Sequence, residues 1–127
     1  MHQISSQEQE IMKIIWGAGE SRLTTRDIEA RLASLDGKAR NLSSLMSVIA
    51  RLVDKGFLDP VKKFRQSTYF VAIIQESEYK SYVTAQFIDS VHLGRLSSFM
   101  SSLLDSRQYT QQDIDELRGI LDEKKRP

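Results

Sequence analysis

Apolar side chains recur with helical spacing in three segments near the start of the chain, and each segment is bounded by residues that begin or end helices. The first two segments begin at Ser or Thr followed three residues later by an acid, and glycine stands at each of the three ends. In the third segment the apolar positions fall at i, i+3, i+4 and i+7, which puts them on one face toward a core. The pattern predicts three short helices, over about residues 5–17, 24–36 and 41–55.

After Gly56 the pattern becomes that of β-structure. Phe57–Phe64 and Thr68–Ile73 are rich in β-branched and aromatic residues, and with the short segment 65–67 between them they predict a two-stranded hairpin. Pro60 has no backbone N–H to donate, so the first strand should lie at a sheet edge or be irregular at that point.

From Glu76 onward the helical spacing returns. It predicts a long helix whose apolar pattern continues to Leu103, a break at residues 105–109, and a last helix capped by Thr110. Three short helices followed by a hairpin are the winged form of the helix-turn-helix, in which the third helix can enter the major groove of DNA. The predicted fold class is therefore mainly α with a small β-hairpin: a winged helix-turn-helix (residues 1–75) followed by a two-helix dimerisation tail (residues 76–127).

The composition excludes several classes of protein. The chain has 127 residues, of which 40% are hydrophobic, so it is able to bury a packed core. It has no cysteine, which excludes disulfides, thiolate metal sites and a cysteine nucleophile, and which fits a reducing compartment. We see neither a long apolar run nor a basic-then-apolar leader, and so expect a soluble cytoplasmic protein without a membrane partner.

The sequence predicts no catalytic group, metal site or cofactor. The two histidines are His2, near the start of the chain, and His92, which lies alone in a helical segment. The serines have no accompanying His-Asp arrangement, and there is no Gly-rich phosphate-binding loop. The sequence therefore favours a binding protein over an enzyme.

Basic side chains are concentrated in the middle of the chain. The formal net charge is only +1 at pH 7, but residues 22–65 carry ten Lys or Arg and five Asp or Glu, whereas the remainder carries eight and twelve. This distribution is expected when one part of a protein binds a polyanion, although an imbalance of this size also occurs on ordinary surfaces.

The third predicted helix and the hairpin carry the residues expected to contact DNA. Opposite its apolar face the helix presents small hydroxyl side chains, which allow close approach to base edges and phosphates. Basic residues lie before this helix and around the hairpin tip, where each would add salt-dependent affinity. The predicted DNA-binding residues are Lys38, Arg40, Ser43, Ser44, Met46, Ser47, Arg51, Lys62, Lys63 and Arg65. Two alternatives stay open: the serines at the helix start serve only as caps, and Arg51 pairs with a nearby acid.

The tail carries more apolar surface than two helices can bury by themselves, because no third layer covers it. Burial against a second copy gives a two-fold homodimer, in which two winged helices face half-sites about one helical turn, or a multiple of it, apart. The predicted interface residues are Phe87, Val91, Leu96, Phe99, Met100, Leu103, Ile114, Leu117 and Leu121. For Phe99 and Met100, a small-molecule pocket is the alternative.

Several segments, taken in order, resemble those of the BlaI/MecI-type penicillinase repressors. They are Ile11-Met12-x-x-Ile15-Trp16, the stretch 45–58 with its Arg51-Leu52-x-x-Lys55-Gly56, Thr68-Tyr69-Phe70, and the stretch 113–121. Single segments occur in many winged helices, but the ordered set covers nearly the whole chain and is more specific. The resemblance implies a homodimer that represses transcription from a dyad-symmetric double-stranded DNA operator, often with TACA and TGTA half-sites.

The chain departs from this family at two points, and one branch of the family is excluded. Many members carry a basic residue where Met46 stands, which leaves the operator sequence open. In the penicillinase branch an inactivating protease cuts the tail at an Asn-Phe bond, and Ser102-Leu103 stand at that place, so such a protease partner is left open. The copper-responsive branch uses a cysteine-rich C-terminus, which is excluded here.

The sequence thus predicts a DNA-binding transcriptional repressor that acts as a homodimer. Two other functions fit the same pattern: a winged helix that docks onto another protein without DNA, and a winged-helix regulator that responds to a small ligand.

Overall fold

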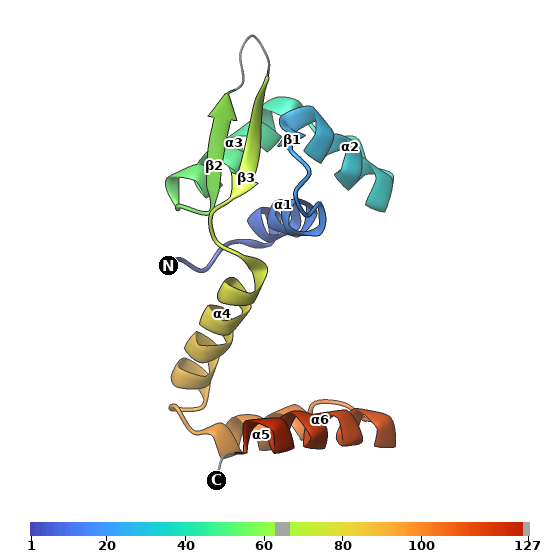
Figure 1. Cartoon of the computed structure of the whole chain (residues 1–127), viewed down its shortest axis with the longest axis vertical. Coiled ribbons are helices and arrows are strands. Elements are labelled where there is room, and N and C mark those ends of the chain that lie inside the picture. Colours follow the sequence, from blue (N-terminus) through green and yellow to red (C-terminus); the bar gives the residue numbers. More distant parts are fainter. Residues whose placement is uncertain (63–66, 126–127) are drawn as a thin grey trace. The chain divides into compact units, whose positions relative to one another are not determined.

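The computed structural model describes residues 1–62 and 67–125 (Figure 1). These residues form six helices and a three-stranded antiparallel sheet. In chain order the elements are α1 (Ser6–Gly17), β1 (Leu23–Thr24), α2 (Thr25–Asp36), α3 (Leu42–Asp54), β2 (Leu58–Lys62), β3 (Thr68–Ala72), α4 (Glu76–Val91), α5 (Leu96–Asp105) and α6 (Gln111–Lys124). The predicted mainly helical class with a small hairpin is confirmed.

The first three helices begin where the capping pattern predicts. The Ser5 hydroxyl accepts a hydrogen bond from the Glu8 N–H, and the Glu8 carboxylate accepts one from the Ser5 N–H. Thr24 and Asp27 form the same reciprocal pair at the start of α2. At the start of α3 the Asn41 side chain accepts from the Ser44 N–H at 3.1 Å.

The sheet has one more strand than the predicted hairpin. β2 and β3 pair antiparallel with Pro60 opposite Phe70, and β1 adds on the other side of β3 with Leu23 also opposite Phe70. The strand order β1-β3-β2 leaves β2 at an edge, where the missing N–H of Pro60 breaks no ladder, as expected. β1 was missed because two residues are too short to show an alternating pattern.

A single core joins α1, α2, α3 and the start of β2 to the first half of α4. The Tyr79 side chain of α4 is buried, its ring lies 5.5 Å from that of Phe57, and its hydroxyl accepts from the Ile4 N–H at 3.0 Å. The Trp16 indole N–H donates to the Ile74 carbonyl at 2.9 Å. The buried apolar residues are Ile4, Ile11, Met12, Ile15, Leu23, Ile28, Leu32, Leu45, Val48, Ile49, Leu52, Phe57, Leu58 and Tyr79.

The chain divides into two compact units, unit 1 (Met1–Val83) and unit 2 (Thr84–Pro127). The expectation of one helix from Glu76 to Leu103 is wrong, because α4 ends at Val91 and α5 begins at Leu96. Between them Leu93 and Gly94 both have positive φ angles, 53° and 74°, which no continuous right-handed helix contains. The last helix does begin after Thr110, whose hydroxyl accepts from the Asp113 N–H as predicted.

In unit 2 the ring centroids of Phe87, His92 and Phe99 lie 5.5–6.3 Å from one another, and His92 Nδ1 lies 2.9 Å from the Ser98 hydroxyl oxygen. Across the described part of the chain, no helix has the length and apolar character needed to cross a membrane.

Candidate nucleic-acid interface

One side of α3 is committed to the core and the opposite side is open to solvent. Leu45, Val48, Ile49 and Leu52 are buried, as the spacing predicts. The opposite side carries an exposed row of four small or flexible side chains, Ser43, Met46, Ser47 and Ala50. We call these four residues the outward row of α3. Three of them are members of the predicted DNA-binding set.

The serines of α3 have different local partners. Ser44 has its N–H capped by Asn41 and lines a hollow of about 210 Å³ with Gln7 and Glu10 of α1, so it faces α1. Ser47 donates its hydroxyl proton to the Ser43 carbonyl at 3.2 Å, one turn back in the helix. The exposed oxygen of Ser47 is then an acceptor for an incoming group.

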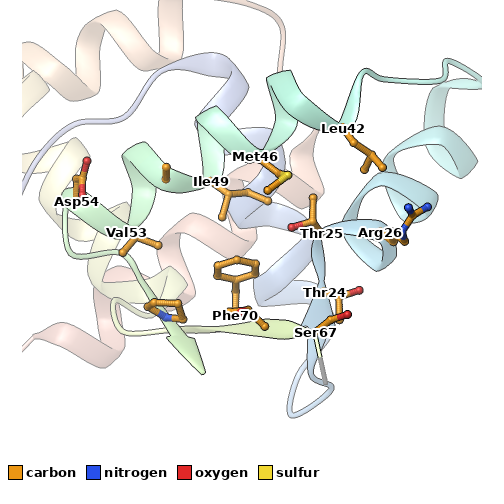
Figure 2. A pocket seen from close by; sticks show the side chains of 13 residues that line it. Thr24, Thr25, Arg26, Leu42, Met46, Ile49, Val53, Asp54, Ser67 and Phe70 are labelled. Carbon is orange, nitrogen blue, oxygen red and sulfur yellow. The ribbon is translucent and has the colours of Figure 1, made fainter. Parts of the chain in front are cut away.

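A groove of about 560 Å³ runs along α3 on the side of the sheet (Figure 2). Its apolar lining comes from Met46, Ile49 and Val53 of α3 and from Phe70 of β3. Figure 2 shows the Arg26 side chain near Leu42, toward one end of the groove, and Asp54 near the other. The groove is therefore largely apolar between α3 and Phe70, with Thr and Ser side chains also in its lining and opposite charges at its ends. Its lining residues are Thr24, Thr25, Arg26, Leu42, Met46, Ile49, Ala50, Val53, Asp54, Pro60, Ser67, Thr68 and Phe70.

The basic residues before α3 are engaged with acids. Arg40 makes an ion pair with Asp36, and its guanidinium also lies 3.8 Å from the Glu10 carboxylate. The hydrogen bond from Arg40, with one from the Lys38 backbone N–H at 3.0 Å, holds the pKa of the Asp36 carboxyl below its usual value. Arg40 therefore ties the end of α2 to α1, while the Lys38 side chain is exposed.

Arg51 also has an acidic partner. Such a pairing was the alternative to DNA contact that the sequence left open for this residue. Its Nε lies 3.6 Å from the carboxylate of Glu8, a residue only 1% exposed. The same carboxylate accepts hydrogen bonds from Lys55 Nζ at 2.8 and 3.0 Å. Arg51 keeps a half-exposed side chain.

The wing is described only in part. Lys62, at the end of β2, is exposed. Lys63 and Arg65, also predicted to contact phosphates, lie outside the described residues.

Sequence reasoning missed Arg26, which is exposed in the first turn of α2 and lines the groove. A cation in this turn lies at the positive end of the helix dipole, where acids are favoured. That unfavourable placement, two residues after the predicted cap Thr24, was the signal available. Arg22 was missed too, and its guanidinium stacks over the Tyr69 ring at 5.0 Å. In the described ranges no group of three or more His, Asp or Glu is placed to hold a metal ion.

Three helices with an antiparallel hairpin beside the third, and a short strand before the second, define a winged-helix protein. The chain belongs to the penicillinase repressor family, because the sequence model of that family matches residues 4–123. The class is thus that of winged-helix, DNA-binding repressors of transcription.

Two curated relatives and one solved structure illustrate the similarity. The methicillin resistance regulatory protein MecI of Staphylococcus aureus (strain N315) is 31% identical over 123 residues, covering 97% of this chain and 96% of that protein. The penicillinase repressor of Bacillus licheniformis is 30% identical over 123 residues, covering 97% and 92%. The structure of RosR from H. salinarum is 12% identical in sequence, with a TM-score of 0.53, and the match covers 97% of this chain and 94% of RosR. At this identity the likeness shows the fold alone. Both named curated relatives are regulators.

Proposed function

We propose that this chain represses transcription by binding, as a homodimer, a dyad-symmetric operator in double-stranded DNA. The observation that carries the proposal is the outward row of α3, an exposed helix face whose side chains are small or flexible. Such a face lets a helix come close to base edges in the major groove. Membership of the repressor family supports the same function.

In the proposed complex each element of unit 1 meets a different part of the duplex. The outward row of α3 faces the base edges, while Arg26 and Thr25 at the start of α2 lie toward the backbone. Lys62 and the neighbouring wing residues Lys63 and Arg65 contact flanking phosphates. Arg40 and Arg51 act mainly within the protein in this proposal, since both are paired with acids.

The proposed dimer rests on unit 2. Among its described residues only His92 is buried, so α5 and α6 leave their apolar side chains without a core of their own. Of the predicted interface residues, Phe87, Val91, Leu96 and Leu121 are 47–62% exposed. The others, Phe99, Met100, Leu103, Ile114 and Leu117, are half-buried. A second copy would cover these side chains, and the dimer would then present two winged helices.

A salt titration of DNA binding tests the proposal. Fluorescence anisotropy is measured with operator fragments selected from genomic DNA by the purified protein. Affinity should fall by about a thousandfold or more between 50 and 200 mM salt if six or more phosphates are contacted. A protein-docking module would bind no duplex even at low salt, and a small ligand that alone releases the operator would reveal a ligand-responsive regulator.

Introducing an acid on the outward row should abolish operator preference. We expect Ser47→Glu to lower operator affinity roughly tenfold or more, because a carboxylate meets phosphates and base acceptors in the groove. Ser81→Glu makes the same change at an exposed serine of α4, within unit 1, and should bind like the parent. Full operator preference in Ser47→Glu would remove α3 from the role of reading helix.

A further inference from the structure

The outward row of α3 lacks the side chains that usually read bases through paired hydrogen bonds. Such reading relies on Arg or Lys at guanine and on Asn or Gln at adenine. The row consists of Ser43, Met46, Ser47 and Ala50, none of which makes a paired contact. The one guanidinium of α3, on Arg51, lies on the side of the helix that faces α1 and pairs with Glu8 there.

The hydroxyl groups of the row offer little discrimination. Ser47 already donates its proton to the Ser43 carbonyl at 3.2 Å, so its oxygen only accepts. The Ser43 hydroxyl is a single group that can either donate or accept, so it cannot tell one base from another through a paired contact. Base selection by α3 therefore needs a contact other than paired hydrogen bonds.

Met46 is the large apolar side chain of α3 that stays largely exposed, at 58%. Figure 2 shows it beside Ile49, on the side of the helix that faces the groove and Phe70. Leaving an apolar side chain in water forgoes the free energy of burying it, which a fitting apolar partner would recover. Met is also flexible and polarizable, so it adapts to the shape of such a partner.

Base edges in the major groove offer one apolar group, the C5-methyl of thymine. Building on the proposed operator binding, we propose that Met46 is a specificity-determining residue that selects thymine by packing its side chain against this methyl group. Ala50, one turn further along the row, is small enough to let the base edge approach. Arg26, near the end of the groove at Leu42, fixes the neighbouring backbone and adds no base preference.

A cycle of protein and DNA changes tests this contact. Each thymine of the selected operator is replaced in turn by deoxyuridine, which pairs identically but lacks the methyl group. For the parent protein, replacing one particular thymine in each half-site should lower operator affinity about fourfold. This is the factor that corresponds to about 0.8 kcal/mol per buried methyl-sized group. Met46→Ala should bind the thymine and deoxyuridine operators equally at that position. The substitution leaves the fold intact because the side chain is exposed and Ala favours helix.

Two further variants bound the interpretation. Met46→Leu keeps an apolar side chain and should keep most of the discrimination, while Ser81→Ala, at an exposed serine of α4 outside the proposed contacts, should keep all of it. If the parent binds its operator but discriminates no thymine, or if the discrimination persists in Met46→Ala, the assignment of Met46 is overturned and operator binding stands. If Met46→Ala weakened binding by the same factor, relative to the parent protein, on the thymine and on the deoxyuridine operator, Met46 would contact a sugar and not the methyl group. That result would also overturn the assignment. If the parent binds no duplex, the proposed function fails first.

Discussion

At the scale of single residues, Glu8 has the most partners of any acid in the described chain. It is 1% exposed and holds Lys55, the Ser5 N–H and, at 3.6 Å, Arg51. Burial alone would raise the pKa of its carboxyl, but the hydrogen bonds from Lys55 and Ser5 outweigh it, so the pKa lies below its usual value. Glu8 thereby joins the start of α1 to the end of α3, and so helps to set the orientation of the proposed reading helix relative to α1.

The Glu8 carboxylate should therefore stabilise the fold in a pH-dependent way. A pKa that is lower in the folded chain gives stability that is present above the ordinary value of 4.5 and is lost as the pH falls through the folded value. We expect Glu8→Gln to lower the free energy of unfolding by about 1–3 kcal/mol at pH 7, since it leaves Lys55 and Arg51 without their acid. Urea unfolding at pH 7 and pH 3 measures this, and the deficit should shrink at pH 3.

The matched control is Glu20→Gln, at an exposed acid, which should stay within about 0.5 kcal/mol of the parent. A deficit of Glu8→Gln that is the same at both pH values would show that packing, and not the charge, is what Glu8 supplies.

The same residue shows where sequence reasoning about the site ends. The capping role of Glu8 was predictable, because Ser5 lies three residues before it. Its pairing with Lys55 was not, since the two are 47 residues apart and meet only when α1 packs on α3. For the same reason a count of cations near α3 overstated those free for phosphates. Arg51 meets Glu8 across a helix contact that no local pattern contains, and Arg40, besides its local pair with Asp36, lies close to Glu10 of α1.

At the scale of elements, the corner between α4 and α5 is the main difference from the sequence prediction. Apolar spacing runs across it without interruption, and a single glycine within a helix is tolerated, so the pattern favoured one helix. The chain turns because Leu93 and Gly94 are both left-handed, and the Gly94 N–H closes the end of α4 on the Ile88 carbonyl at 3.0 Å. The spacing of apolar residues indicates which helix faces are apolar, but it does not indicate that Leu93, before Gly94, adopts a left-handed conformation.

A glycine-to-alanine change tests this corner, and a second one inside α6, expected to act in the opposite direction, is its control. Gly94→Ala should destabilise the protein by about 1–2 kcal/mol, because an L-residue resists the φ of 74°. Gly119→Ala should stabilise it by about 1 kcal/mol, since Gly119 lies inside α6 and an added Cβ meets nothing within 4 Å. Urea unfolding at one fixed protein concentration, followed by helical circular dichroism, gives both values. A neutral Gly94→Ala would mean that α4 and α5 straighten into the helix predicted from spacing.

At the scale of the whole molecule, the two units bury apolar surface in different ways. Unit 1 closes around a core from its helices and sheet, whereas the described part of unit 2 buries only His92. The apolar stripes that define such a core were predictable from spacing for unit 1. In unit 2 similar stripes exist, but what they pack against is a property of the assembly and not of one chain.

Acids placed on the exposed apolar residues of unit 2 should separate the two copies. Leu96→Asp and Leu121→Asp change side chains that are 62% and 54% exposed, so each protomer keeps its own packing while a dimer interface would bury a carboxylate. Sedimentation velocity should show monomers, and a dimer that survives both changes would place the interface elsewhere. Leu35→Asp, at a leucine of α2 that is 76% exposed, should sediment like the parent.

The same variants decide whether dimerisation serves operator binding. A dimer engages the second half-site at the high effective concentration set by the first, so monomers should lose about a hundredfold or more on the full operator. Their affinity for DNA with a single half-site should stay unchanged, because unit 1 carries the proposed contacts. If the variants lost affinity equally on the full operator and on the single half-site, the substitutions would have damaged the fold of unit 1. Dimerisation would then make no separate contribution to operator binding.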